Sequence, residues 1–198
     1  MIETEYDVIV AGYGPVGETC ANLLGYYGIK ALILDKEKNA YPLPRAITWD
    51  AECQRAMSHC EFLSEVKTRK IRGVDNKDAN KKSIMKITME GFDTYNYQHR
   101  ILFIHQPQFD EAHRENAKKY STNTIKTGSE LLAVDEINGV VNCTYKDIET
   151  NEQFKVTSKY LLACDGANST VRKLNNIKLN SLDADEAWMV VDGYTKSS

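Results

Sequence analysis

The glycines near the N-terminus are spaced in a way that suits phosphate binding. Residues 12–17, Gly-Tyr-Gly-Pro-Val-Gly, fit the pattern G-x-G-x-x-G. Between a strand and a helix, such a turn directs backbone N–H groups and the positive end of the helix dipole at one spot. The first glycine allows the tight turn, the second lets a pyrophosphate approach the backbone, and the third lets helix and strand pack closely. The pattern therefore predicts a dinucleotide site.

The residues on either side of the glycines predict the elements that would position them. An apolar run, 6–11, is expected as a buried strand, and a helix is expected from Pro15 to Tyr27 with Gly28 at its C-terminal cap. A second strand, 31–34, ends at Asp35, whose carboxylate can accept hydrogen bonds from ribose hydroxyls. Because FAD and NAD present the same ADP end, this βαβ unit alone does not distinguish them.

Apolar residues recur near helical spacing in the first predicted helix, at Val16, Cys20, Leu23, Leu24 and Tyr27. Beyond Asp35 the pattern loosens into a loop that holds two prolines and Arg45. The central part of the chain then predicts further elements with polar loops between them. In chain order they are a helix at 51–59 capped by Asp50, a polar surface segment at 69–82, strands at 83–89 and 100–104, and a helix at 108–120.

The C-terminal part of the chain predicts a β-meander. Residues 131–137 and 140–145 form a hairpin signal around Asn138-Gly139, a pair that suits a type I′ turn. A further strand at 154–157 extends the hairpin. The apolar run 160–164 then predicts a separate buried parallel strand, which Asp165-Gly166 ends.

The segment after the meander carries a family resemblance. Residues 164–172, Cys-Asp-Gly-Ala-Asn-Ser-Thr-Val-Arg, resemble the D-G-x-x-S-x-x-R signature of class A flavoprotein monooxygenases, the para-hydroxybenzoate hydroxylase family. Pro44-Arg45-Ala46 and Ile104-His105-Gln106-Pro107 resemble two further segments of that family. The likeness is closest to its 3-(3-hydroxyphenyl)propionate hydroxylase group and covers nearly the whole chain.

This resemblance implies an α/β fold of the Rossmann-like FAD-binding type, with a parallel sheet, helices, a β-meander insertion and the beginning of a substrate-domain sheet. It places the FAD-binding domain at residues 1–178, without the later G-D motif of the family, and the start of a substrate-binding domain at 179–198. It also implies FAD in extended form, with Asp35 on the adenosine ribose and Asp165-Gly166 at a groove shared with the nicotinamide donor. The predicted cofactor-binding residues are Gly12, Gly14, Pro15, Val16, Gly17, Asp35, Lys36, Arg45, Gln106, Leu132, Asp165 and Gly166.

The chemistry implied by the family uses NAD(P)H and O2 to hydroxylate a small phenolic substrate on FAD, and no catalytic residue is assigned here. Asp35 stands where the family usually has Glu, one methylene longer. Since the G-D motif and most of a substrate domain are absent, we expect little hydroxylation by this chain alone. Three hypotheses remain: part of a cut or split hydroxylase, a non-catalytic remnant or binding module, and a flavin- or NAD-linked reductase.

Charge and composition exclude several other classes. A net charge of -3 gives no electrostatic reason to expect nucleic acid binding, and no apolar run reaches the length of about 20 residues that a membrane helix needs. Five irregularly spaced cysteines do not suggest a disulfide framework, which favours a reducing cytoplasm. The four histidines show no metal-ligand spacing.

Two further sets of charged residues have no function assigned to them. Glu111, Arg114 and Glu115 are expected to form a solvated helix face with local ion pairs. Arg172 either supports its own short helix or contacts a cofactor or partner.

An unfinished sheet would leave an edge strand free to pair with another chain. We therefore expect a homo-oligomer or a partner chain at the region after Leu179.

Overall fold

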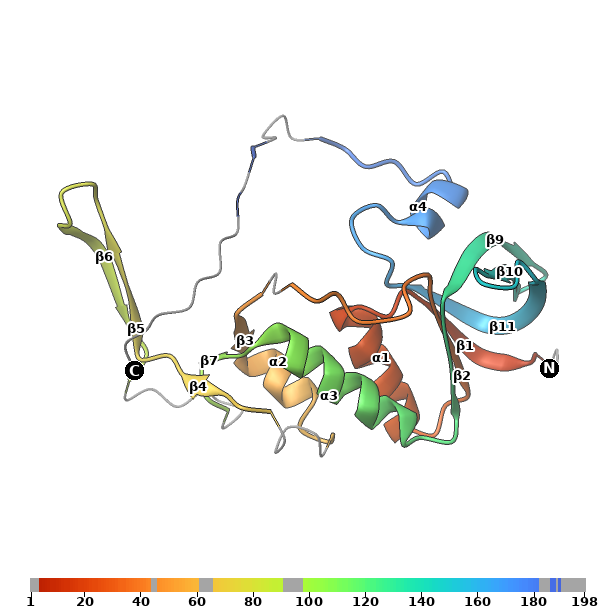
Figure 1. Ribbon diagram of the computed structural model, residues 1–198, viewed down its shortest axis with the longest axis horizontal. Helices are drawn as coiled ribbons and strands as arrows, with labels where there is room; N and C mark the ends of the chain where they lie inside the picture. The colour runs from red at the N-terminus through yellow and green to blue at the C-terminus, as the bar shows by residue number, and fades with distance from the viewer. Residues whose placement is uncertain are drawn as a thin grey trace.

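A six-stranded sheet forms the centre of the protein (Figure 1). The computed structural model describes residues 4–43, 46–60, 66–90, 98–181, 186, 187 and 189. The strand order is β8-β2-β1-β11-β10-β9, parallel from β8 to β11 and antiparallel from β11 to β9. The strands span β1 Tyr6–Ala11, β2 Ala31–Asp35, β8 Asn123–Thr127, β9 Ser129–Ile137, β10 Val140–Asp147 and β11 Gln153–Ala163.

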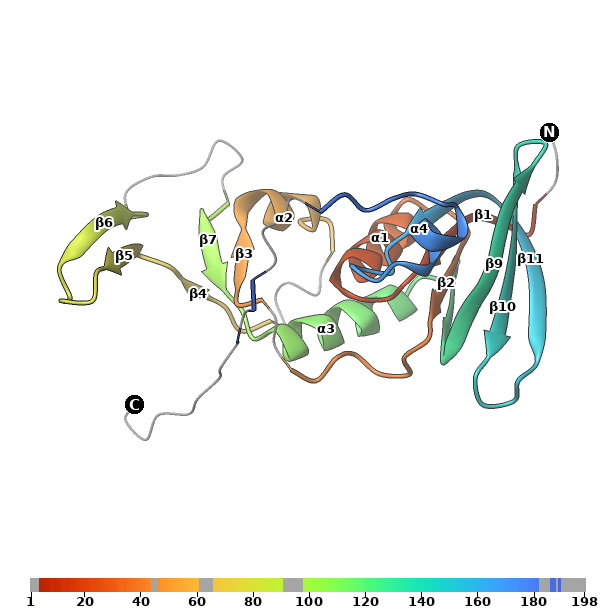
Figure 2. The ribbon, with the colours of Figure 1, turned by 90° about the horizontal axis from the view of Figure 1, so that it is seen from above.

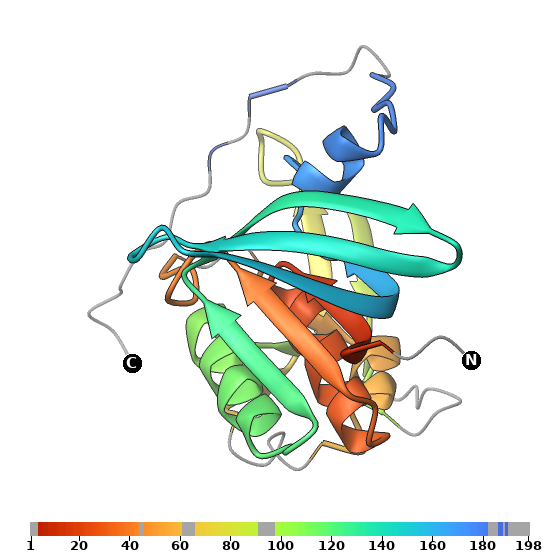
Figure 3. The ribbon, with the colours of Figure 1, turned by 90° about the vertical axis from the view of Figure 1, so that its right-hand side faces the viewer.

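The sheet separates two hydrophobic cores. Helices α1 (Pro15–Tyr26) and α3 (Gln106–Lys118) cover one face of the parallel strands, and the meander curls over the other face (Figure 3). Because successive side chains of a strand point to opposite faces, β1 contributes Val8 and Val10 to the helix side and Ile9 to the meander side. Two-sided burial of this kind explains why the parallel strands appear in the sequence as continuous apolar runs.

A smaller region lies at the other end of the molecule from the meander (Figure 2). It holds a three-stranded sheet of order β3-β7-β4, the helix α2, and a two-stranded hairpin, β5 with β6, that projects away from the body. Trp49 and Met57 pack there against Phe109 of α3. The elements span β3 Thr48–Asp50, α2 Ala51–Ala56, β4 Arg69–Lys70, β5 Gly73–Lys77, β6 Ser83–Thr88 and β7 Ile101–Phe103, and a short helix α4, Thr170–Leu174, follows the main sheet.

The structure confirms the predicted βαβ unit and meander. β1 pairs in parallel with β2, and Gly28 has a positive φ of 69° beyond the end of α1. Asn138 and Gly139 have φ values of 54° and 77°, as a type I′ turn requires. Asp50 caps α2, with its side chain accepting a hydrogen bond of 2.8 Å from Cys53 N.

Several predicted elements are corrected. The runs 154–157 and 160–164 belong to one strand, β11, which pairs antiparallel with β10 and then parallel with β1. Its second half is not buried, because Tyr160 and Leu162 are 67% and 37% exposed. α2 ends earlier and α3 begins earlier than predicted, the polar segment 69–82 contains β4 and β5, and β8 was not predicted.

The apolar spacing of α1 indicates only part of its buried face. Val16 and Tyr27 are 63% and 64% exposed, whereas Glu18 and Asn22 are fully buried beside small residues of the same helix. Of the apolar residues at helical spacing, Cys20, Leu23 and Leu24 pack against the cores, whereas the buried polar residues of the helix were not predicted.

Among the described residues, no helix combines the length and apolar character needed to cross a membrane.

We predict that the meander-side core is a main source of stability. Ile9→Ala should lower the free energy of unfolding by about 2–5 kcal/mol, because a fully buried side chain is truncated and a cavity remains. Urea denaturation would measure the change. Ile137→Ala is the matched control, since that side chain is 57% exposed and its loss should cost within about 0.5 kcal/mol. Equal effects of the two substitutions would contradict this account of the core.

Candidate dinucleotide-binding site

The three glycines of the first loop have different surroundings. Gly12 has a φ of 99°, and a Cβ there would lie 2.4 Å from the carbonyl oxygen of Cys164. A Cβ on Gly17 would lie 1.9 Å from the carbonyl oxygen of Gly12. By contrast, a Cβ on Gly14 would meet no atom of the described residues within 4 Å. Gly12 and Gly17 are thus required by packing, whereas Gly14 leaves an open backbone surface.

That open surface lies at the N-terminus of α1. Gly14 is the N-cap residue, and no side chain caps the helix. Pro15 occupies the first turn, where its missing N–H costs nothing, and the side chains of Pro15 and Val16 are exposed. An uncapped first turn presents N–H groups without intrahelical partners, which is the property that favours an anion.

Asp35 ties the end of β2 to the glycine loop. Its Oδ2 accepts a hydrogen bond of 2.5 Å from Tyr13 N, and its Oδ1 accepts one of 2.7 Å from Glu37 N. Each carboxylate oxygen has capacity for a second donor. Asp35 is half-buried and Lys36 beyond it is exposed, so both can be reached from outside.

Asp165 and Gly166 follow β11 at the same edge of the sheet. Asp165 Oδ2 accepts a hydrogen bond of 3.0 Å from Val171 N, while its buried Oδ1 has no hydrogen-bond partner among the described residues. Gly166 turns the chain with a φ of 76°. Arg172 donates through Nη1 to the carbonyl oxygen of Ala167 at 2.9 Å, so this arginine supports its own turn.

The remaining predicted residues lie farther along the chain. Gln106 begins α3, and its Oε1 accepts a hydrogen bond of 2.8 Å from Ala46 N, which anchors the segment after the predicted Arg45. Leu132 lies half-buried on β9. Arg45 itself, together with the neighbouring Pro44, falls outside the described residues. The same holds for most of the segment after residue 181, where the start of a substrate-binding domain is predicted.

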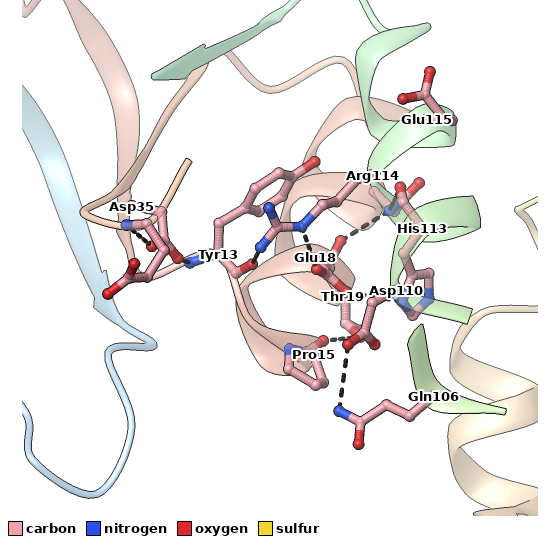
Figure 4. A network of polar contacts seen from close by, with 12 residues as sticks. Tyr13, Pro15, Glu18, Thr19, Asp35, Gln106, Asp110, His113, Arg114 and Glu115 are labelled. Atoms are coloured by element: carbon pink, nitrogen blue, oxygen red, sulfur yellow. Dashed lines mark hydrogen bonds and ion pairs between the residues drawn. The ribbon is translucent and has the colours of Figure 1, made fainter. Parts of the chain in front are cut away.

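Sequence reasoning missed a buried polar network between α1 and α3 (Figure 4). Arg114 was expected on a solvated face, but its side chain is only 12% exposed and its Nε donates to Glu18 Oε1 at 2.7 Å. Its Nη2 also donates to the carbonyl oxygen of Tyr13. The spacing of Glu18, Ala21, Asn22 and Gly25, a helical face of small and polar residues, was the signal that could have located this interface.

Burial shifts the ionisation of three groups in this network. It raises the pKa of Glu18 to about 7, even though Arg114 acts in the opposite direction. It raises the pKa of Asp110 to about 6, and the neighbouring Glu18 adds to that shift. It lowers the pKa of His113 to about 4, so the 3.5 Å contact of His113 Nδ1 with Glu18 Oε2 is not an ion pair at neutral pH.

A cavity of about 600 Å³ opens beside the network. Tyr13 and Arg114 line its inner wall, and residues 38–42 and the outer turns of α3 line the rest. Within the part of the chain that the structure describes, no group of three or more His, Cys, Asp or Glu side chains is placed to hold a metal ion.

Comparison with known proteins agrees with this geometry. The family described as FAD binding domain matches residues 5–197. The chain belongs to this family. A 3-(3-hydroxy-phenyl)propionate/3-hydroxycinnamic acid hydroxylase of Comamonas testosteroni is 29% identical over 192 residues, which cover 96% of this chain and 32% of that protein. The chain therefore spans about a third of the length of this curated relative.

Solved structures share the fold of this FAD-binding domain. The anhydrotetracycline hydroxylase OxyS of Streptomyces rimosus superposes with a TM-score of 0.73 at 25% identity, over 90% of this chain and 35% of its own. Aklavinone-11 hydroxylase, solved in a ternary complex with FAD and aklavinone, gives a TM-score of 0.71 at 17% identity over 89% of this chain and 36% of its own. The predicted fold class and family are thereby confirmed.

We predict that Glu18 makes the stability of this FAD-binding domain depend on pH. Its pKa is raised from 4.5 to about 7 on folding, so its stabilising contribution is full below about pH 4.5 and is lost as the pH rises through about 7. Relative to wild type, Glu18→Gln should gain on the order of 2 kcal/mol between about pH 5 and about pH 8. Urea unfolding across that range measures the difference.

The control for this prediction is Glu115→Gln, which alters a side chain that is 61% exposed on α3. It should leave the pH dependence of the wild type unchanged. Asp110 and His113 titrate in both proteins of the Glu18 comparison, so to first order their contributions cancel. Parallel stability curves for wild type and Glu18→Gln would refute the prediction.

Proposed function

We propose that this chain is the FAD-binding part of an NAD(P)H-dependent flavoprotein monooxygenase that hydroxylates a small phenolic substrate. The observation that carries the proposal is the convergence of three strand ends. Gly12 N donates to the carbonyl oxygen of Leu34 at 2.7 Å, and Cys164 N donates to that of Ala11 at 2.7 Å. The glycine loop, Asp35 and Asp165 thus lie at one edge of the sheet, where open α/β folds bind ligands.

The chemistry of this edge fits the parts of FAD. Gly14 and the uncapped start of α1 offer N–H groups and open space to a pyrophosphate, and Pro15, Val16 and Gly17 complete that turn. Asp35 has acceptor capacity for ribose hydroxyls, and the buried Oδ1 of Asp165 lacks a donor that a ligand hydroxyl could supply. We assign Lys36, Gln106, Leu132 and Gly166 to the rim of the same site. From the family resemblance we also propose Arg45 as a cofactor-binding residue.

When bound, FAD would supply the redox chemistry, and this chain would supply binding and orientation. The hydroxylases among its relatives and structural neighbours support an aromatic substrate. We propose NADH or NADPH as the electron donor from the family resemblance alone. We further propose a cytoplasmic location, and a division of the chain into the FAD-binding domain at 1–178 and the start of a substrate-binding domain at 179–198.

A second candidate is an FAD-binding subunit or remnant that does not hydroxylate by itself and that associates with another chain or a second copy. The exposed side chains of Tyr160 and Leu162 on β11 favour it, because apolar residues at the middle of a sheet are normally covered. Light scattering of the purified chain tests association, and a monomer at all concentrations would count against it.

We predict that the purified chain takes up FAD and that Gly14→Ala weakens the uptake. The new methyl group has free space in the protein, so the unfolding midpoint should stay near that of wild type. It would, however, stand between the backbone and the pyrophosphate, and we expect the Kd for FAD to rise by about tenfold or more, equal to about 1.4 kcal/mol. Flavin fluorescence titration gives both Kd values.

The control for this substitution is Lys119→Ala, a change at the exposed C-terminal cap of α3. It should bind FAD as wild type does. A wild-type chain that stays colourless after incubation with FAD and removal of the excess would contradict the proposal of an FAD site. If Gly14→Ala instead bound FAD with the affinity of wild type, the proposal that the pyrophosphate binds at this loop would be wrong.

The two candidate functions differ in their response to a nicotinamide donor. If the chain carries the electron-transfer half of a monooxygenase, anaerobic NADH or NADPH should bleach the flavin absorption of the FAD-loaded protein. A binding subunit or remnant should keep its spectrum under the same conditions. Chromatography of a phenolic substrate after aerobic turnover then shows whether any hydroxylated product forms.

A further inference from the structure

Arg114 is held by α3 but directs its guanidinium at the glycine loop. Nε contacts Glu18 Oε1 at 2.7 Å, and Nη2 donates to the carbonyl oxygen of Tyr13. The guanidinium carbon also lies 4.6 Å from the centroid of the Tyr13 ring, a cation–π distance. Figure 4 shows the side chain between Tyr13 and Glu18. One arginine thus contacts both the loop and the first turn of α1.

Tyr13 is the residue between Gly12 and Gly14, and its backbone is fixed on both sides. Its N–H donates to Asp35 and its carbonyl oxygen accepts from Arg114. Its ring is 1% exposed and packs with Val8, Val10 and Ile33 on the helix side of the sheet. The conformation of the loop backbone therefore depends on Asp35 at one peptide group and on Arg114 at the next.

Glu18 has an electrostatic effect on the same loop. It lies in the first turn of α1 and is fully buried, with its N–H donating to the carbonyl oxygen of Gly14 at 2.8 Å. A carboxylate there offsets the positive helix end that would attract a ligand phosphate. Arg114 supplies the compensating positive charge at 2.7 Å. Without that charge the pKa of Glu18 would rise above about 7, so its carboxylate would oppose an incoming anion only at more alkaline pH.

We propose that Arg114 is a positioning residue for the dinucleotide loop. Arg114 holds the Tyr13 carbonyl, and with it the Gly12–Gly14 backbone, in the conformation that receives a pyrophosphate, and it neutralises Glu18 so that the start of α1 stays attractive to that anion. The inference rests on the proposed FAD site. It adds that α3, through Arg114, holds the loop of that site in its binding conformation.

The ionisable groups around Glu18 come from three other elements. His113, Asp110 and Arg114 face it from α3, Tyr13 from the loop, and Asp35 from the end of β2. Arg114 is the cation among these groups that contacts Glu18 at neutral pH, because burial keeps His113 uncharged. Removal of the guanidinium should therefore affect both the backbone contact and the local charge.

The test uses the variants Arg114→Met, Glu18→Gln and the double variant, with Lys118→Met as control. Lys118 forms an exposed ion pair with Glu115 on the same helix and should behave as wild type. We expect Arg114→Met to raise the Kd for FAD by about tenfold or more and Glu18→Gln to leave it unchanged or lower it. At alkaline pH, where Glu18 is ionised in Arg114→Met, the double variant should recover part of the lost affinity, because the uncompensated carboxylate is gone.

A second readout does not involve FAD. Amide hydrogen exchange of the peptide that contains residues 12–17 should be faster in Arg114→Met than in wild type, in protein without flavin and under conditions where both are folded. If Arg114→Met does not fold, Arg114→Lys replaces it, since lysine keeps the charge but cannot bridge Glu18 and Tyr13 with a planar fork. That variant should show faster exchange with a smaller loss of affinity.

The outcomes separate this inference from the proposed function. Wild-type protein that binds FAD, with the same Kd and the same loop exchange in Arg114→Met, overturns the inference and leaves the FAD site intact. A double variant that loses more affinity than Arg114→Met alone overturns the electrostatic part. Wild-type protein that fails to bind FAD overturns the proposed function, and the inference falls with it.

Discussion

The close approach of the first loop to the end of β11 is the constraint on which the rest of the structure depends. Neither Gly12 nor Gly17 has room for a Cβ, because the Cys164 and Gly12 carbonyl oxygens occupy those positions. The contact packs the start of α1 against Cys164, just after β11, and it brings the residues that follow to the same edge as the glycine loop. Substitution at either glycine would therefore disturb the fold before it affected a ligand.

The parallel part of the sheet and the meander share a single long strand, and this sharing gives the domain its layers. β11 pairs with β10 along its first half and with β1 along its second half. Because sheets twist, the meander turns away from the plane of the parallel strands and folds back over them. Ile9 and Leu32 on one side and Tyr145 and Phe154 on the other fill the space between. The meander therefore covers one side of the core. Its strands β9 and β10 are inserted in the sequence between β8 and β11.

The parts of this architecture that local sequence determines could be predicted. The glycine loop, Gly28 and the Asn138-Gly139 turn all require backbone conformations that few residues adopt, so their sequence signals are specific. β8 escaped prediction because Asn123–Thr127 alternates weakly and owes its strand conformation to pairing with β2. The continuity of β11 was missed because polar Ser158 and Lys159 interrupt the apolar pattern, although Ser158 is fully buried. The family resemblance supplied what spacing could not, the choice of FAD over NAD.

The sequence predicted the candidate-site residues that lie at the ligand-binding edge of the sheet. It did not predict the residues that act on the site through the packing of α1 against α3. α1 and α3 approach closely because Ala21 and Gly25 are small, and a Cβ on Gly25 would lie 2.4 Å from the ring of Tyr120. Because the two helices are so close, short polar side chains of one helix reach the backbone of the other. Hydrogen bonds therefore take the place of apolar packing between them. Asn22 donates to the carbonyl oxygens of Glu18 and His113 and accepts from Asn116 at 2.6 Å. These hydrogen bonds of Asn22 fix the register of the two helices, because a shift of either helix would break them and leave buried amide groups without partners. The position of Arg114 against Tyr13 follows from that register, so the geometry of the glycine loop is set in part by residues about a hundred positions farther along the chain.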